Sequence, residues 1–215
     1  MTDARPRQLH IRLGALLPEG WRDAAPWGYP QQVELALIAG VFRAQTPQSN
    51  VDALVDYVMH SRSHSLLDDA NELVEGGVDG VVASIGPRWG GTNVLGVPVL
   101  RAAVIHDAAE VLVGLGVRSS NDLHAVALAQ PDDLKREILT VRGLGPATWE
   151  WIAFLAHAPV RPPPAVVALL GELLEIDDLD RDEAAELIRL TARRFASDER
   201  VLAHALRAHL DDRDV

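Results

Sequence analysis

Apolar residues recur three and four positions apart along almost the whole chain, and this spacing constrains the fold more than any other feature. It places apolar side chains along one face of an α-helix, whereas a half-buried strand needs apolar and polar residues in alternation. No convincing alternating run lies between turn signals. The pattern therefore predicts an all-α protein. The predicted helices are Pro6–Leu17, Gln31–Ala44, Pro47–His60, Leu66–Glu75, Val78–Ile85, Pro98–Gly114, Ser120–Ala129, Pro131–Thr140, Pro146–His157, Pro164–Leu174, Arg181–Ala196 and Asp198–His209.

Two segments interrupt the helical pattern and are predicted to be loops. In Pro18–Pro30, the aromatic residues Trp21, Trp27 and Tyr29 are expected to hold the connection against the core. The second segment, Gly86–Gly96, is long and rich in glycine. Such a loop is often functional, and a packed Ω-loop without a function is the alternative.

The composition excludes several classes of protein. A hydrophobic fraction of 48% is typical of a packed globular protein rather than a disordered one. No uninterrupted run of 18 apolar residues is present, so we expect neither a membrane span nor a membrane partner. The absence of cysteine rules out disulfides, a thiolate nucleophile and a cysteine-held zinc or iron–sulfur cluster, and makes a cytoplasmic location the default expectation. The eight histidines form no zinc signature, so no metal site is predicted.

The formal net charge of −11 would repel nucleic acid on average, but the charge is unevenly distributed. Residues 1–84 carry a net charge of −5 and residues 166–215 carry −6, whereas residues 85–165 are neutral. The acidity therefore belongs to the two ends of the chain.

The neutral part contains a glycine-rich turn between two predicted helices, in Leu134–Leu155. The turn reads Arg142-Gly143-Leu144-Gly145, and Pro146 begins the next helix. Both glycines can adopt positive φ while the leucine packs back between the helices. Unpaired N–H groups at such a turn, together with the helix dipole, can bind a phosphate without a basic side chain. An ordinary helical hairpin is the alternative, since the Gly-x-Gly pattern is weak by itself.

Two segments taken together carry a resemblance to a known family. V-R-G-L-G-P-A-T, at 141–148, and V-E-L-A-L-I-A-G-V-F-R-A-Q-T-P-Q-S-N-V, at 33–51, resemble the helix-hairpin-helix DNA glycosylases of the endonuclease III type. The resemblance covers roughly Val33 to Leu174. It implies two helical lobes: a six-helix domain at 30–160 that ends with the hairpin, and a second lobe made of 1–29 with 161–215. It also implies that double-stranded DNA lies across the cleft between the lobes, with the target base flipped out.

The resemblance also assigns residues to the DNA interface. The hairpin would hold the phosphate backbone, and a monovalent cation bound to hairpin carbonyls is compatible with it. Gln45 takes the position of a glutamine that fills the gap left by the flipped base, although a surface glutamine before a capping Thr46 is the alternative. The loop Gly86–Val97 takes the place of the family's wedge loop, and stacking and phosphate contacts are expected from it. The implied DNA-binding residues are Gly143, Leu144, Gly145, Ala147, Thr148, Gln45, Arg88, Trp89 and Asn93.

The catalytic positions of the family are not filled. Its catalytic aspartate aligns with Pro163 or Pro164, and the lysine that makes family members AP lyases aligns with Ala147. The glutamate of the adenine-specific members aligns with Gly40, and the four-cysteine cluster is missing. The catalytic residues are therefore unknown.

Two substitute carboxylate sites are weak candidates. Glu150 lies between two tryptophans that could raise its pKa, although a solvated residue between core aromatics is the more ordinary reading. Asp107 and Glu110 share a helix face beside His106, which is most simply a solvent-facing side.

Three functional hypotheses follow. The first is a DNA-binding protein of the base-excision-repair type, which recognises damaged, abasic or distorted duplex with weak or no conventional glycosylase or lyase activity. The second is a monofunctional DNA N-glycosylase that uses a non-standard carboxylate such as Glu150. The third is a non-catalytic module that binds a protein partner through its acidic C-terminal lobe. The sequence leaves open whether the protein is an enzyme.

Overall fold

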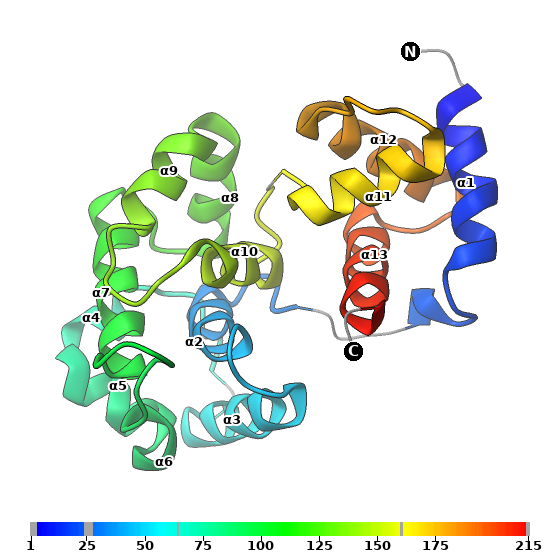
Figure 1. Cartoon of the computed structure of the whole chain (residues 1–215). Helices are drawn as coiled ribbons and strands as arrows, with labels where there is room; N and C mark the ends of the chain where they lie inside the picture. The colour runs from blue at the N-terminus through cyan, green and yellow to red at the C-terminus, as the bar shows by residue number, and fades with distance from the viewer. Residues whose placement is uncertain (1–3, 24–27, 64, 160, 214–215) are drawn as a thin grey trace. The chain divides into compact units, whose positions relative to one another are not determined.

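The computed structural model describes residues 4–23, 28–63, 65–159 and 161–213, and the regular structure within them is helical (Figure 1). The prediction of an all-α protein is confirmed. Across these residues there is no strand, and one isolated antiparallel bridge joins Asn93 to Leu100. The helices are α1 Ala4–Leu16, the 3-10 helix η1 Trp21–Asp23, α2 Val33–Arg43, α3 Gln48–Ser61, α4 Glu72–Glu75, α5 Gly77–Ile85, α6 Pro87–Gly90, α7 Arg101–Gly114, α8 Ser120–Ala129, α9 Pro131–Ile138, α10 Pro146–Leu155, α11 Pro164–Leu174, α12 Arg181–Arg194 and α13 Glu199–Arg213.

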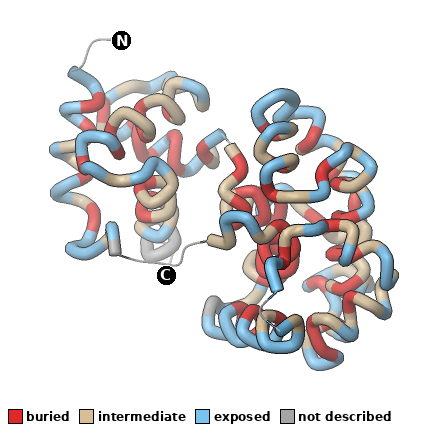
Figure 2. The backbone as a smooth tube through the Cα atoms, turned by 180° about the vertical axis from the view of Figure 1, so that it is seen from behind, coloured by how far each residue is buried: buried red, intermediate tan, exposed pale blue. Residues whose placement is uncertain are grey.

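The chain divides into two compact units. Unit 1 comprises residues 1–27 and 161–215, and unit 2 comprises residues 28–160. Each unit has its own cluster of buried apolar side chains. Buried residues, apolar and polar, are the red segments of the backbone tube in Figure 2. The described part of unit 2 forms nine helices, from α2 to α10, where the resemblance implies six; α4 and α6 are single turns of four residues.

Unit 2 is built around α2. Every residue from Val33 to Phe42 is buried, which is the expected state of a helix that is apolar on nearly all sides. The neighbours α3, α7 and α10 pack against it. At Gly40 the backbones of α2 and α10 approach so closely that an added Cβ would lie 2.5 Å from Cγ1 of Ile152 and 2.9 Å from its Cα. Gly40 therefore has a packing role.

The predicted helix Leu66–Glu75 is wrong over most of its length, because only Glu72–Glu75 is helical. The preceding segment is held in an irregular conformation by the carboxylate of Asp68. Its Oδ1 accepts the backbone N–H groups of Val33 and Ser120, each at 2.9 Å. Asp68 thus joins the starts of α2 and α8 through hydrogen bonds.

Two boundaries around the second predicted loop also differ from expectation. The predicted helix Pro98–Gly114 begins only at Arg101, since the preceding residues fold back: Val99 accepts a hydrogen bond from the N–H of Val94 at 2.9 Å. The predicted loop Gly86–Gly96 contains the short helix α6 at its start. Its remaining part is an irregular turn.

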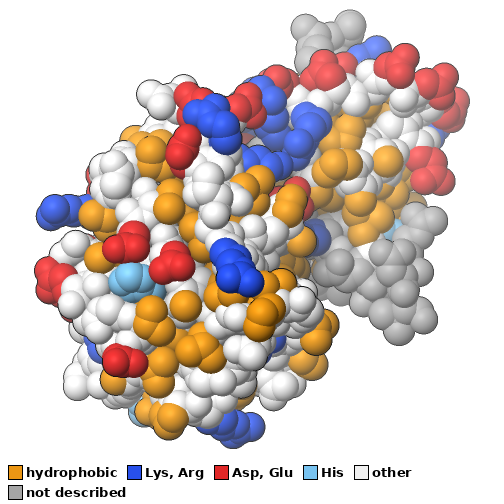
Figure 3. Space-filling model, turned by 60° about the vertical axis from the view of Figure 1, so that its left-hand side comes forward, with side chains coloured by type: hydrophobic (Ala, Val, Ile, Leu, Met, Phe, Trp, Pro, Cys, Tyr) orange, Lys and Arg blue, Asp and Glu red, His pale blue; other side chains and the backbone are white. Residues whose placement is uncertain are grey.

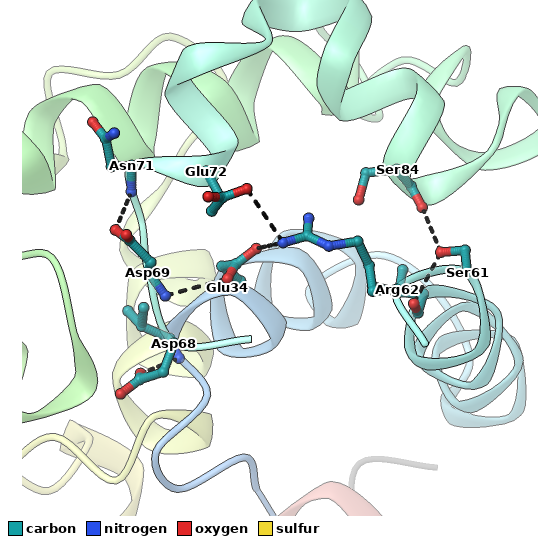
Figure 4. Close-up of polar contacts among 10 residues, drawn as sticks. Glu34, Ser61, Arg62, Asp68, Asp69, Asn71, Glu72 and Ser84 are labelled. Atoms are coloured by element: carbon teal, nitrogen blue, oxygen red, sulfur yellow. Dashed lines mark hydrogen bonds and ion pairs between the residues drawn. The ribbon is translucent and has the colours of Figure 1, made fainter. Parts of the chain in front are cut away.

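A buried carboxylate joins α2 to the segment after α3 (Figure 4). Glu34 is 1% exposed; its Oε2 lies 3.3 Å from Nη2 of Arg62, and its Oε1 accepts the N–H of Asp69 at 3.2 Å. The same guanidinium lies 3.6 Å from the more exposed carboxylate of Glu72. Burial raises the pKa of Glu34, while the Asp69 N–H and the arginine lower it. Arg62 therefore supplies the counter-charge for a carboxylate that is removed from water.

Unit 1 packs α1, α11, α12 and α13 around a core that includes Leu9, Leu170 and Leu187. The side chain of Asp180 caps α12 by accepting the N–H groups of Asp182 and Glu183, each at 2.8 Å. This is the capping expected of an aspartate at a helix start.

The aromatic residues of the first predicted loop pack in two places. Trp21 lies edge-on to Phe195 in unit 1, with ring centroids 5.4 Å apart. Tyr29 packs on the core of unit 2, where its N–H donates to the carbonyl of Leu155 at 2.7 Å, and burial raises its pKa to about 12. Trp27 lies outside the described residues. Among the helices of the described ranges, none combines the length and the apolar character that a membrane crossing requires.

Candidate nucleic-acid interface

Three segments that are distant in sequence meet at one end of unit 2. Oε1 of Gln45, just after α2, accepts the N–H of Leu95 at 2.7 Å. A Cβ added to Gly143 of the hairpin would lie 3.5 Å from Cγ2 of Val94 and 3.0 Å from Cγ2 of Val104. We call this region, residues 42–46, 88–104 and 141–148, the hairpin end. The structure thus brings together the three segments that the resemblance assigns to the DNA interface.

The hairpin itself follows from its glycines and its leucine. Gly143 has φ +93°, a conformation that strains other residues, and Leu144 is 4% exposed and donates its N–H to Val141 at 3.1 Å. Of the two glycines that can adopt positive φ, Gly143 does so, whereas Gly145 is the extended N-cap of α10 with φ −94°. One left-handed residue is enough, because Pro146 starts the helix directly afterwards.

Several backbone N–H groups of the hairpin have no acceptor in the part of the chain that the structure describes. They belong to Gly143, Gly145, Ala147 and Thr148. No side chain caps α10, so the first turn keeps its unpaired donors and the positive end of its dipole. Ala147 is exposed and Thr148 is buried. The monovalent cation with which the resemblance is compatible at this turn is not tested by these contacts.

Gln45 and the loop after α6 present an apolar side chain to solvent. Leu95 is 77% exposed, although its backbone is held by the amide oxygen of Gln45. Sequence reasoning missed this residue because it concentrated on the polar and aromatic residues of the loop. The available signal was a leucine between a valine and a glycine, outside any helical repeat. On the face in Figure 3, hydrophobic side chains are common and charged ones are scattered among them.

The other predicted loop residues take different positions. Trp89 is half-buried on the core and lies edge-on to Phe42, with ring centroids 6.1 Å apart. The exposed Arg88 places its guanidinium 4.8 Å from the Trp89 ring. Asn93 is exposed and bridges to Leu100 through its backbone. Stacking of a base on Trp89 would therefore compete with the Arg88 guanidinium that lies over its ring.

The segments that form the hairpin end contain no acid. Residues 35–51, 80–106 and 138–149 hold four arginines and no aspartate or glutamate, in a chain with 31 acidic residues. The arginines are Arg43, Arg88, Arg101 and Arg142. None of the four forms an ion pair with another described residue; the guanidinium of Arg43 lies 4.5 Å from the Trp151 ring instead. These segments by themselves therefore carry a formal charge of +4, despite the net charge of the chain.

The residues that the resemblance aligns with catalytic positions of the DNA glycosylases have structural roles here. Pro163 is the N-cap of α11 and Pro164 its first residue, in unit 1. Gly40 permits the close contact with α10, so a glutamate there is sterically excluded. Glu150 is half-buried on α10 and forms no hydrogen bond or ion pair with a described residue. None of these positions supplies a carboxylate paired with a second catalytic group.

One group of side chains in the described residues has metal-ligand spacing. Nδ1 of His106 lies 3.0 Å from Oδ1 of Asp107 and 3.8 Å from Oε2 of Glu110, all on α7. These atoms could contact one cation. A hydrogen bond between the imidazole and the aspartate on a partly exposed helix face explains the same geometry.

These features define a two-unit, all-α protein with an acid-free, arginine-bearing hairpin end. The chain belongs to the family DUF8548, a domain of unknown function, whose model matches residues 13–209 and so extends over both units. No curated protein and no solved structure matched the chain.

Proposed function

We propose that this protein binds double-stranded DNA through the phosphate backbone, and that it recognises damaged, abasic or distorted duplex with little or no conventional glycosylase or lyase activity. The observation that supports this most is the convergence of unpaired hairpin N–H groups, uncompensated arginines and an exposed leucine on segments without acid. Base-excision repair is the process in which such recognition is used.

Each part of the hairpin end has a role in this proposal. The N–H groups of the hairpin and the arginines would contact phosphates, which fixes the position of the protein without reading sequence. Leu95 and Gln45, which are joined by a hydrogen bond, would enter the base stack together. Insertion costs least where the stack is already broken, so an abasic or distorted duplex is the favoured ligand.

Duplex binding is expected to weaken strongly as salt increases. If all four arginines contact phosphates, the slope of log K against log salt is about −3.6, which is about a 100-fold loss between 50 and 200 mM salt. Fluorescence anisotropy with a labelled abasic duplex and an intact duplex of the same sequence measures both the slope and the preference. An affinity independent of salt would contradict the proposal.

Leu95→Ala is expected to lower the affinity for abasic duplex by about tenfold and to leave the affinity for intact duplex unchanged. The substitution removes apolar surface that would be buried only on insertion, worth about 1.4 kcal/mol. Because this side chain is 77% exposed, the melting temperature should not change. Leu128→Ala on α8, where the side chain is 63% exposed, is the matched control. Equal losses for both variants would argue against insertion.

A residual glycosylase activity is the second candidate, and the place of Glu150 on α10, just after the hairpin, favours it. The test is base release from duplexes that carry uracil, oxidised guanine, alkylated purines or mismatches. Release that Glu150→Gln abolishes would support the enzyme, and no release across the panel would exclude these substrates. If neither duplex is bound, the third hypothesis, a partner surface in the acidic residues 166–215, becomes the better explanation.

A further inference from the structure

Arg101 is a half-buried cation whose partners among the described residues are all neutral. Its Nη1 donates to Oγ1 of Thr92 at 2.9 Å, and its Nη2 lies 3.5 Å from Oε1 of Gln45. The guanidinium carbon is 5.0 Å from the ring of Phe42. Its Nε is covered by protein and has no acceptor within the described residues. The guanidinium is therefore fixed by three neighbours, none of which carries a negative charge.

This arrangement is unfavourable for the isolated protein. Burial lowers the pKa of Arg101, because the charged form loses hydration that no carboxylate replaces. A desolvated charge without a counter-charge costs free energy, and it recovers that free energy when an anion binds. Arg62, elsewhere in unit 2, differs in this respect, because its charge is balanced by the carboxylates of Glu34 and Glu72.

The segment of the chain around Arg101 contains no acidic residue that could neutralise its charge. The segment 80–106, which contains this arginine, has no aspartate or glutamate. The side chain beside the guanidinium is the neutral amide of Gln45; a glutamate at this position would form an ion pair with Arg101. The 3.5 Å contact to that amide is at the limit of a hydrogen bond, so it is easily exchanged for a charged acceptor.

We propose that Arg101 is an oxyanion site, which takes a phosphate group through its Nη2 beside Gln45. That this phosphate belongs to the DNA backbone rests on the proposed function. Free inorganic phosphate would form the same hydrogen bonds and ion pair with Arg101. On binding, the phosphate replaces the weak contact of Gln45 with the guanidinium, while the Leu95 N–H still holds the amide oxygen. The anion site thus lies directly beside the proposed insertion pair.

The test compares three variants of the full chain. Arg101→Met keeps an apolar stem against Phe42 and removes the charge. Gln45→Glu supplies a fixed carboxylate at the same place. Arg136→Met is the matched control, because it removes one positive charge as Arg101→Met does. Arg136 is an exposed arginine of α9 that already has a carboxylate partner, Asp133. Melting temperatures are measured in phosphate and in chloride at equal ionic strength, and the arginine Nε–H resonances are followed by NMR during titration with inorganic phosphate.

The wild-type protein and Arg136→Met are expected to melt at a higher temperature in phosphate than in chloride. Arg101→Met should lose the part of this difference that exceeds the non-specific stabilisation of folded proteins by phosphate. Gln45→Glu should also lose it, yet melt above wild type in chloride, since the new carboxylate neutralises Arg101. A gain in stability together with a loss of phosphate response cannot result from misfolding. A full phosphate response in Arg101→Met, or no movement of the Arg101 resonance in wild type, would overturn the proposal.

Duplex binding separates this inference from the proposed function. Arg101→Met is expected to weaken duplex binding about tenfold and to reduce the salt slope by about one. If wild type responds to phosphate through Arg101 but binds no duplex, the oxyanion site stands and the DNA function fails. If duplex binding is salt-dependent but unaffected by Arg101→Met, the DNA function stands and this site fails.

Discussion

Gly40→Ala is expected to destabilise unit 2 by about 3 kcal/mol. The added Cβ would lie 2.5 Å from Cγ1 of Ile152 and 2.9 Å from its backbone N and Cα, and a rotamer change cannot remove the backbone contacts. Helices α2 and α10 would have to separate, which loosens the packing around a fully buried helix. Overpacking of a core costs about 1–3 kcal/mol, and the backbone contact places this substitution at the upper end.

Gly114→Ala is the matched control for this prediction. Gly114 ends α7, has no positive φ, and a Cβ there would meet no atom within 4 Å. The alanine should be neutral or stabilise by up to about 1 kcal/mol, since glycine is a poor helix former. Urea unfolding monitored by circular dichroism measures both variants. Equal stabilities for the two would show that the close contact of α2 and α10 is not required.

Arg62→Met is expected to cost about 3–5 kcal/mol at neutral pH, because it leaves the carboxylate of Glu34 buried without its counter-charge. The double variant Arg62→Met with Glu34→Gln should recover most of this loss, since a neutral amide needs no counter-charge. Glu72→Gln is the control: its carboxylate is half-exposed and should contribute about 0–1 kcal/mol.

The loss in Arg62→Met should depend on pH in a defined direction. Burial already raises the pKa of Glu34 above its ordinary value of 4.5, and removal of the arginine raises it further. A carboxyl group whose pKa is higher in the folded than in the unfolded state stabilises the fold at low pH, and this contribution is lost as the pH rises through the folded-state pKa. The stability deficit of the variant relative to wild type should therefore be largest at neutral pH and shrink toward pH 4.5. A deficit that is constant across this range would indicate lost packing of the arginine stem instead.

The helices were predictable where residues close together in the sequence determine them. The apolar run of α2 and the Gly-Pro start of α10 are local signals, and both elements form as expected. Residues 66–71 were predicted wrongly because distant partners decide their conformation: Asp68 accepts N–H groups from the starts of α2 and α8. Local propensity contains no information about such a partner.

The candidate interface was predictable only in part. The glycine turn identified the hairpin, and the segment around Gln45 was found through its resemblance to a family. Leu95 and Arg101 were missed, because their importance depends on exposure and on the absence of a counter-charge. Exposure and pairing are properties of the folded chain, and neither has a signature in the spacing of residues.

By itself, the sequence determined that the chain is helical, that it lacks cysteine chemistry, and that its acidity lies toward the two ends. These properties follow from composition and from the 3.6-residue period of the α-helix, which act over a few neighbouring residues. Only the tertiary structure decided that three acid-free segments meet at the hairpin end, that Glu34 is neutralised by Arg62, and that Arg101 has no carboxylate partner among the residues the structure describes. The physical reason is that the energy of a charge depends on the burial and the partners that folding gives it, which residues far apart in the chain supply.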